Sequence, residues 1–475
     1  MPARNPCDLT ARALARRLRR GELTATAVLD AHLERIAQHN GALNAVVSLD
    51  EGRARESARA ADAALRRGTV LGPLHGLPIT LKDGHDVAGL RTTIGSSYFD
   101  RLATEDGTVA ARLRASGAII IGHTNVPTML ADYQSANPIF GRTNNPWDTA
   151  RSPGGSSGGA AAAVAAGMTP FEIGSDLAGS LRLPAHFCGV YALKTTEHRV
   201  PITGFFRPPA GTPQSVRIML SLGPVARDLG DLELALRLVA GPDGVDSDVP
   251  PVPLAVARGR RLEIEKLRLA VAPALPGMTV ARSIRERVEA VATAAADAGA
   301  TIEHSLPSVE WESLRSLFVD LVMTITGIFD PSATLRDEQR SLAWYLGALA
   351  QRDQLLATWE TFFERVDALI LPVAMTTAFT HRQTGEPIDV DGKPVSYWEL
   401  GALLTFCNLT GIPALVVPAG VDDQGLPIGL QIIGPRWSEM HLLDIARALE
   451  RADILPGFRS PRLAGLGGLT TPASA

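Results

Sequence analysis

A glycine- and alanine-rich segment constrains what this chain can fold into more than any other feature. It reads SPGGSSGGAAAAVAAGM over residues 152–168, and TPFEIGSDLAGSLRLPAHFCGVYALKTT follows directly over residues 169–196. The glycine pairs around Ser156 and Ser157 permit backbone conformations closed to other residues, and the alanine run allows close helix packing. A flexible linker is the commoner meaning of Gly/Ser clusters, but a linker has no reason to join such a helix and a second Gly/Ser/Asp cluster. The segment therefore predicts the wall of an active site.

Two familiar glycine-rich motifs fit this segment poorly. A phosphate-binding loop needs Gly-Lys-Ser/Thr after its glycines and a strand before them, and neither is present. The segment satisfies G-x-S-x-G twice, but residues 142–153 before it are polar and bounded by proline, so the strand that leads into a nucleophile elbow is missing. The histidines available for such a triad lie in stretches that do not look like a site: His186, His198, His304, His381 and His441.

A serine and a lysine form a better candidate pair. In GSDLAGS, residues 174–180, consecutive small residues can direct backbone N–H groups at a developing oxyanion, which makes Ser180 the candidate nucleophile. Lys82 ends the apolar strand predicted within LGPLHGLPITLKD, residues 71–83, and burial lowers a lysine pKa towards the range of a general base. The alternative is that Lys82 pairs with Asp83 at a strand edge.

Alternating helical and strand patterns predict an α/β fold. Residues 8–67 show helical spacing throughout, and residues 107–117 predict a helix that leads into a buried strand at 118–122. Further strands are predicted at 267–272, 367–374, 412–420 and 429–434, with a helix at 283–299. This order indicates a sheet with helices on both faces.

Composition excludes several classes of protein. The 475 residues carry 46 Lys+Arg against 50 Asp+Glu, so no basic stripe supports a nucleic-acid or anionic-membrane partner. Cys7, Cys188 and Cys407 lie far apart without a CxxC pair, which indicates neither a disulfide framework nor a thiolate metal site and fits a reducing compartment. The N-terminus lacks the apolar core of a signal peptide, and no stretch of ~18 apolar residues predicts a membrane span. We expect a cytoplasmic protein.

At three motifs the sequence resembles the amidase signature family. Lys82 in GLPITLKD, Ser156 in SPGGSSGG and Ser180 in GSDLAGSLRLPA look like its Ser–Ser–Lys triad. The separations, 74 residues (156 − 82) and 24 residues (180 − 156), match the family's layout in order and closely in length. The similarity covers most of the chain and continues through residues 43–47, 86–96, 119–127, 137–147, 406–420 and 425–434.

The resemblance implies a fold and three catalytic roles. It implies a single domain over residues 1–464, built on a large, mixed, mostly parallel twisted sheet with helices on both faces. Its parts would be N-terminal helices at 8–67, a signature core at 71–200 and a C-terminal part at 254–460, followed by a flexible tail at 465–475. Ser180 would attack the amide carbonyl, and Ser156, on a cis peptide bond, would bridge the proton path to Lys82.

The resemblance also implies the surroundings of the triad. Backbone N–H groups at Leu177, Ala178, Gly179 and Ser180 would form the oxyanion hole. Asp176 and Arg182 would brace the loop, and Ser157 would join the hydrogen-bond network. Leu130 aligns with a substrate-contacting position of fatty-acid-amide-type members. No metal or organic cofactor is implied.

Three positions depart from the family pattern. Ala178-Gly179 replaces the usual Gly-Gly, and the added Cβ narrows the conformations available to the loop. ALKTTEHRVP at 192–201 replaces GLKPT-x-GRVP, so we expect a different course for the chain that leaves the site. His123 stands where lysine is common, at a position we expect to be structural.

The resemblance implies an amidohydrolase that works through an acyl-enzyme, with an apolar aryl or alkyl amide as the expected small-molecule substrate and esters and carbamates as further ones. The acyl pocket would include Leu130, residues 203–211 and the segment around Trp344, although Phe205, Phe206 and Trp344 fit core packing equally well. Two alternatives stay open: the glutamine-hydrolysing subunit of a tRNA-dependent amidotransferase, which works with a partner subunit, and an inactive binding protein. A homodimer also stays open.

Overall fold

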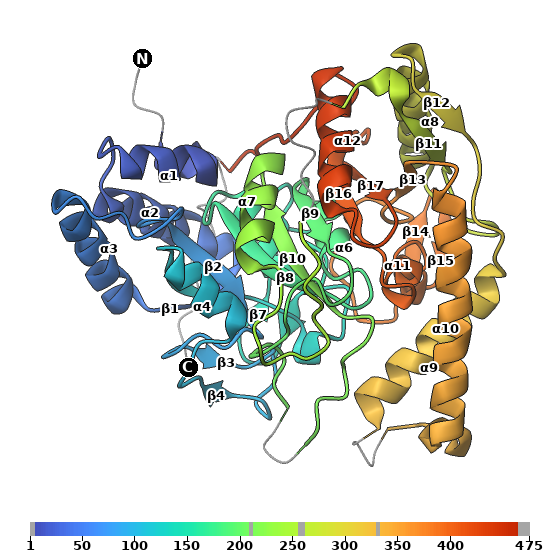
Figure 1. Cartoon of the computed structure of the whole chain (residues 1–475), viewed down its shortest axis with the longest axis horizontal. Coiled ribbons are helices and arrows are strands. Elements are labelled where there is room, and N and C mark those ends of the chain that lie inside the picture. Colours follow the sequence, from blue (N-terminus) through green and yellow to red (C-terminus); the bar gives the residue numbers. More distant parts are fainter. Residues whose placement is uncertain (1–4, 209–211, 255–261, 329–332, 464–475) are drawn as a thin grey trace.

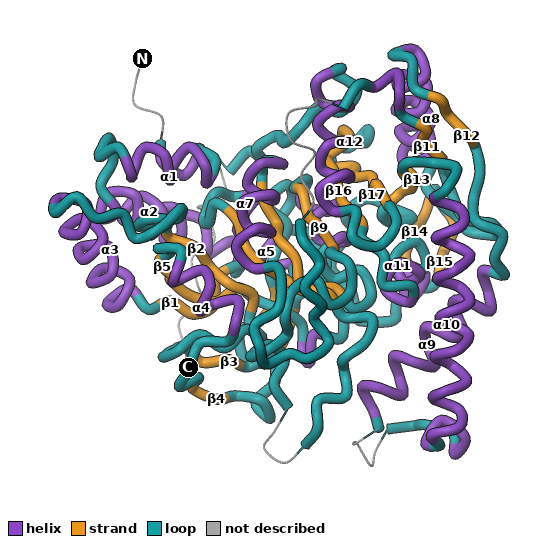
Figure 2. Tube along the Cα trace, viewed as in Figure 1, coloured by secondary structure: helices purple, strands orange, loops and turns teal. Residues whose placement is uncertain are grey.

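A central β-sheet with helices on both faces organises the computed structural model, which describes residues 5–208, 212–254, 262–328 and 333–463 (Figures 1 and 2). The helices are α1 (Ala11–Arg19), α2 (Ala25–Leu43), α3 (Glu51–Arg66), α4 (Thr108–Ala115), α5 (Gly158–Ala165), α6 (Arg182–Cys188), α7 (Leu229–Val239), α8 (Arg282–Asp297), α9 (Trp311–Gly327), α10 (Leu342–Phe363), α11 (Thr405–Leu409) and α12 (Glu439–Arg451). The predicted tail at 465–475 lies outside the described residues.

The strands fall into one large sheet and several small ones. They are β1 (Val46–Leu49), β2 (Pro78–Lys82), β3 (Arg91–Thr92), β4 (Arg101–Leu102), β5 (Ile119–Thr124), β6 (Ala136–Asn137), β7 (Gly141–Arg142), β8 (Phe171–Asp176), β9 (Tyr191–Lys194), β10 (Ser221–Ala226), β11 (Arg268–Val271), β12 (Thr301–Glu303), β13 (Ala368–Pro372), β14 (Ile388–Val390), β15 (Lys393–Val395), β16 (Ala414–Val421) and β17 (Pro427–Ile433). The eight-stranded sheet has the order β12-β11-β13-β17-β16-β9-β10-β8. A three-stranded sheet, β1-β5-β2, continues it because β2 packs beside β8.

The large mixed sheet confirms the predicted α/β class, but the expected parallel majority is wrong. Only β11 pairs in parallel, with β12 and with β13, and the other five neighbouring pairs of the eight-stranded sheet are antiparallel. The reason is visible at β16 and β17, which a short turn over residues 422–426 joins, and two strands so closely linked must run in opposite directions. An apolar run predicts a buried strand without its direction.

Most of the helices and strands that the sequence predicts are present, with their ends shifted by a few residues. Helix α4 leads into the fully buried strand β5, and the C-terminal expectations correspond to α8, β11, β13, β16 and β17. The prediction of helix throughout residues 8–67 is wrong at β1, which separates α2 from α3. Asn44 ends α2 in the left-handed conformation, with φ of 49°, and the Asn40 side chain accepts the N–H groups of Ala45 and Val46. These polar caps redirect the chain into a strand.

The alanine-rich helix α5 explains the small residues of the signature segment. It is buried along its whole length and packs against β2, β8, β10 and α6. A Cβ at Gly159 would lie 2.4 Å from the Asn125 backbone nitrogen, which only a residue without a side chain avoids. Close packing of α5 brings the loop before it against the strand that carries Lys82, as the sequence predicted.

Helices α9 and α10 lie together at one edge of the molecule, where Figure 1 shows them as long helices beyond the sheet. Helix α9 also packs against the short helix α11. Within the described ranges, no helix combines the length and apolar character that crossing a membrane requires.

Candidate active site

Lys82 ends β2 with a fully buried side chain whose amine contacts three hydroxyls. Nζ donates to Ser156 Oγ at 2.7 Å, Ser157 Oγ at 2.9 Å and Ser175 Oγ at 2.8 Å. The expected alternative, an ion pair with Asp83, is not formed, because the Asp83 carboxylate accepts hydrogen bonds from the backbone and hydroxyl of Thr93. The amine is therefore free of a direct counter-ion.

Burial decides the protonation of this amine. Removal from water lowers the pKa of Lys82 to about 7, and the nearby carboxylates of Asp176, Glu172 and Asp83 oppose that shift. A substantial fraction of Lys82 is therefore neutral near pH 7. A neutral amine that touches two serine hydroxyls of the signature loop can accept a proton from either of them.

The loop before α5 holds Ser156 and Ser157 against Lys82. The peptide bond between Gly155 and Ser156 is cis, as the resemblance implies. A Cβ at Gly155 would lie 2.4 Å from the backbone oxygen of Asp132, so the loop requires glycine there. Ser157 Oγ also donates to the Ser175 carbonyl at 3.3 Å, which ties the loop to β8. The structure thus brings Ser157 into the predicted network.

Asp176 and Arg182 brace the loop that carries Ser180, between the end of β8 and the start of α6. The two side chains form a fully buried ion pair at 3.0 Å. Burial disfavours the Asp176 anion, but the charge and hydrogen bonds of Arg182 outweigh burial and hold the pKa of Asp176 well below its usual range. Asp176 also accepts the N–H groups of Gly179 at 2.8 Å and Leu181 at 3.1 Å. The side chains of Asp176 and Arg182 therefore hold the backbone of this loop in place.

These contacts reduce the number of backbone N–H groups that are available for the predicted oxyanion hole. The Gly179 N–H is committed to Asp176, whereas the N–H groups of Leu177, Ala178 and Ser180 have no acceptor among the described residues. Gly179 takes φ of 99°, and a Cβ there would lie 2.2 Å from Leu404 Cδ1. Ala178 does not have a positive φ, so the alanine departure from Gly-Gly is compatible with this loop.

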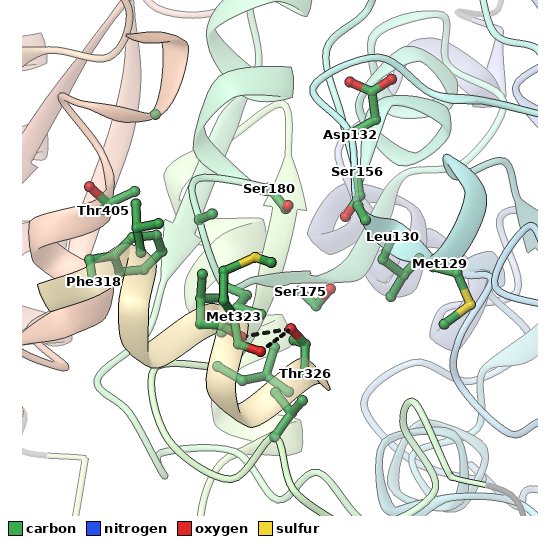
Figure 3. A pocket seen from close by; sticks show the side chains of 18 of the residues that line it. Met129, Leu130, Asp132, Ser156, Ser175, Ser180, Phe318, Met323, Thr326 and Thr405 are labelled. Carbon is green, nitrogen blue, oxygen red and sulfur yellow. Dashed lines mark hydrogen bonds between the residues drawn. The ribbon is translucent and has the colours of Figure 1, made fainter. Parts of the chain in front are cut away.

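Ser156, Ser175 and Ser180 line one cavity of about 1500 Å³, together with Leu177 and Ala178. Figure 3 shows the side chains of Ser156 and Ser180 directed towards the same gap from opposite sides. The apolar lining includes Tyr98, Phe99, Met129, Leu130, Phe205, Phe206, Val216, Leu220, Phe318, Val319, Val322 and Met323. Guanidinium groups line the cavity at Arg315 and Arg336.

Some of the other residues expected in the pocket line this cavity and some do not. Leu130 lies on it, as Figure 3 shows, and both Met129 and Leu130 have left-handed backbones with φ of 57° and 59°. Phe205 and Phe206 also line it, whereas Trp344 does not and instead packs on α10 against the hydrophobic core. Of the two interpretations left open for Trp344, the structure supports core packing. Both were open because sequence does not show which face of α10 meets the cavity.

The histidines of the chain lie away from the described lining of this cavity. His186 is buried, its Nδ1 accepts the Gly429 N–H at 2.7 Å, and burial lowers its pKa to about 4. His123 is buried in β5 with Nδ1 3.0 Å from the Arg91 carbonyl, consistent with the structural position we expected.

The segment after Lys194 that departs from the family pattern is buried up to residue 200, except for the half-buried His198. Lys194 is fully buried and donates to the carbonyls of Thr195 and Ile412. His198, where the family pattern has glycine, takes φ of 62°, a left-handed conformation that histidine adopts more readily than most residues. Arg199 then forms a buried ion pair with Glu439 of α12 at 3.0 Å.

Sequence reasoning missed three functional neighbours. Ser175 contacts Lys82 as closely as Ser156 does, and Asn408 binds the Asp176 carboxylate and its carbonyl, each at 3.0 Å. Glu172 lies buried on β8 near Lys82. A polar residue inside an apolar strand, as in FEIGSD, was the available signal for Ser175 and Glu172. Asn408, distant in sequence, had none.

Comparison with known proteins identifies the family of the chain. The family model described as Amidase matches residues 27–329 and 326–443. The chain is 34% identical over 486 residues to one of the subunits of glutamyl-tRNA(Gln) amidotransferase from Symbiobacterium thermophilum, in a match that covers 93% of this chain and 96% of that protein. It is similar to the structure of 6-aminohexanoate cyclic dimer hydrolase complexed with substrate (TM-score 0.78, 26% identity, 96% and 99% covered). The native peptide amidase from Stenotrophomonas maltophilia is a further structural neighbour (TM-score 0.76, 26% identity, 96% and 99% covered).

The family model matches most of the chain, and the site combines a buried lysine that contacts no carboxylate with serine hydroxyls on an apolar cavity. The chain belongs to the amidase family and is a hydrolase that acts on amide carbon–nitrogen bonds.

Proposed function

We propose that Ser180 is the nucleophile of this hydrolase, with Ser156 as the proton relay and Lys82 as the base. The observation that carries the proposal is the buried Lys82 amine, which contacts the hydroxyl of Ser156 at 2.7 Å and no carboxylate. A lysine kept neutral by burial can replace the histidine of other serine hydrolases.

The proposed reaction uses these three side chains in sequence. Neutral Lys82 takes the proton of Ser156 as Ser156 takes that of Ser180, and the Ser180 oxygen forms a bond to the carbonyl carbon. The N–H groups of Leu177, Ala178 and Ser180, which have no other acceptor among the described residues, stabilise the oxyanion. The carbon–nitrogen bond then breaks as the relayed proton moves to the nitrogen, which leaves an acyl-enzyme. Water then loses a proton to the same relay and attacks the ester carbonyl. The carbon–oxygen bond to Ser180 breaks as the relay returns that proton to the Ser180 oxygen, which releases the acid and restores the enzyme.

We propose an apolar aryl or alkyl amide as the substrate. The walls that face the serines carry aromatic and aliphatic side chains, and the cavity volume of about 1500 Å³ exceeds what a small amide fills. Esters and carbamates present the same carbonyl and fit the same mechanism. The cytoplasmic location we expect is supported by three cysteines that are all buried and free.

The alternative is the glutamine-hydrolysing subunit of a tRNA-dependent amidotransferase, which the 34% identity to such a protein favours. Glutamine carries an α-carboxylate that needs a cationic partner. The guanidiniums on the described part of the cavity wall are already paired, Arg315 with Glu399 and Arg336 with Asp320 at 2.8 Å. We therefore place the apolar amide first.

A substrate panel tests this order. The purified chain is assayed with an anilide, a fatty amide, a small primary amide, a carbamate and glutamine, and Ser180→Ala serves as the control for each. We expect kcat/KM to be highest for the anilide or the fatty amide and to be lost in Ser180→Ala. Preference for glutamine over both apolar amides would overturn the proposed substrate class.

A further inference from the structure

Glu172 is a buried carboxylate that the proposed mechanism does not use. It lies on β8 with no exposed surface, and no cation among the described residues lies within ion-pair distance of it. Its two oxygens instead accept hydrogen bonds from threonine hydroxyls, Oε2 from Thr80 at 2.6 Å and Oε1 from Thr124 at 2.5 Å. A buried carboxylate without a counter-ion is costly unless a nearby group compensates its charge.

Both threonines belong to the immediate surroundings of Lys82. Thr80 lies two residues before Lys82 on β2, so its side chain leaves the same face of that strand. Thr124 is the register partner of Lys82 in the parallel pair of β2 and β5. Strand β8, which carries Glu172, packs beside β2. The carboxylate and the amine therefore share one buried region and meet through hydroxyl-bearing neighbours.

We propose that Glu172 is a positioning residue for this reaction, a buried counter-charge that controls how readily the Lys82 amine takes up a proton without contacting it. The inference rests on the proposed function of Lys82 as the base. Lys82 and Glu172 are two buried ionisable groups without direct ion-pair partners among the described residues, so their charges compensate each other. A proton gained by one group makes proton loss from the other more favourable.

The pKa directions of the two groups agree with this geometry. Burial raises the pKa of Glu172 to about 7, against the hydrogen bonds of Thr124 and Thr80 and the charge of Lys82. The pKa of Lys82, lowered by burial, is also about 7. Both groups therefore exchange protons in the range in which the base must become neutral.

Other ionisable groups are packed around β2 and β8, and two of them, Asp176 and Asp83, also raise the pKa of Lys82. Each of the acidic ones is held by an arginine or by backbone N–H groups, which Glu172 is not, and burial lowers the pKa of each histidine. Thr93 binds Asp83, Arg182 pairs with Asp176, and the amides of Ala11 and Arg12 bind Asp231 of α7. The histidines are His32, His85 and His123. Helix α5 and strand β10 contribute no ionisable side chain.

The test uses a fluorophosphonate probe and intact-protein mass spectrometry to measure the rate of Ser180 labelling between pH 5 and pH 10. Glu172→Gln removes the anion that favours the protonated amine. We expect the midpoint of its acid limb to lie about one pH unit or more below that of the wild type. One unit below the wild-type midpoint, the variant's rate relative to its plateau is then several-fold higher.

Two further variants separate electrostatics from structure. Thr80→Val removes a hydroxyl that stabilises the anion, so its midpoint should fall in the same direction, whereas Thr80→Ser keeps the hydroxyl and should keep the wild-type midpoint. Asp231→Asn is the matched control, because Asp231 is another buried carboxylate with a raised pKa, at the contact of α1 and α7. It should lower the melting temperature and leave the midpoint unchanged.

An unchanged midpoint in Glu172→Gln, with or without a lower plateau, would overturn the inference. If that variant does not fold, equal midpoints in Thr80→Val and Thr80→Ser would do so instead. Failure of the proposed function looks different, because the wild type would then not label at Ser180 at any pH.

Discussion

At the scale of single residues, the proposed mechanism depends on the protonation state of Lys82. Its three contacts all go to hydroxyls, so no carboxylate in direct contact holds the charged form. The residue types and spacing of Lys82, Ser156 and Ser180 could be predicted from sequence, since each lies in a distinctive motif. Ser175 could not, because its contact with Lys82 depends on how β2 packs beside β8.

The pH dependence of acylation should report this amine. Because burial lowers the pKa of Lys82 to about 7, the neutral form dominates above that pH, and its fraction falls about tenfold for each pH unit below it. We expect the labelling rate of Ser180 to show an acid limb with a midpoint near pH 7. Lys82→Ala should label about 10²–10⁴-fold more slowly at pH 7. An acid limb that persists unchanged in Lys82→Ala would assign it to another group.

Two adjacent residues of the oxyanion loop should respond differently to small substitutions. Gly179→Ala places a Cβ 2.2 Å from Leu404 Cδ1 at φ of 99°, so the loop must shift. We expect at least a tenfold loss of kcat, since a displaced oxyanion donor costs about 10²–10³-fold in rate. Ala178→Gly, at a position without positive φ, should reduce kcat much less. Equal losses in both variants would contradict the assigned loop geometry.

At the scale of elements, helix α9 forms one side of the substrate cavity and sets its size. Phe318, Val322 and Met323 lie on the cavity, and Figure 3 shows Met323 on the side of α9 that is turned towards the serines. The sequence predicted apolar substrates but not this helix as a wall, because α9 lies far from the signature segment in the chain. The packing of α9 against α11 and α10 places this helix in the fold.

Enlarging a side chain of α9 should change selectivity for acyl length. Met323→Trp narrows the cavity beside the nucleophile, so we expect KM for a long-chain fatty anilide to rise while KM for acetanilide changes little. The ratio of their kcat/KM values should fall about tenfold, the effect of a few lost apolar contacts. Leu346→Trp is the control, because Leu346 is exposed on α10 and does not line the cavity. Equal ratios in the two variants would remove α9 from substrate selection.

At the scale of the whole molecule, the α/β class and the helical cover of the sheet could be predicted from alternating patterns. The strand directions could not, since apolar runs such as those of β13 and β17 are the same in either direction. The predicted single domain over residues 1–464 stays a prediction.

The whole chain should work on its own. The proposed nucleophile, relay and base and the unpaired N–H donors all come from residues 82–180 of this chain, and α9 of the same chain lines the cavity. We therefore expect the chain purified to homogeneity to hydrolyse an apolar amide at a rate that is unchanged by added cell extract. Hydrolysis that appears only with a co-purifying partner would favour the amidotransferase alternative.

The most direct test of the account is the identity of the acylated residue. The protein is treated with a slowly deacylated carbamate or a fluorophosphonate at pH 8 and digested, and the adduct is located by tandem mass spectrometry. The account predicts one covalent adduct on Ser180, which is lost in Ser180→Ala and strongly slowed in Lys82→Ala. An adduct on Ser156, Ser157 or Ser175 in the wild type, or undiminished labelling without Lys82, would contradict it.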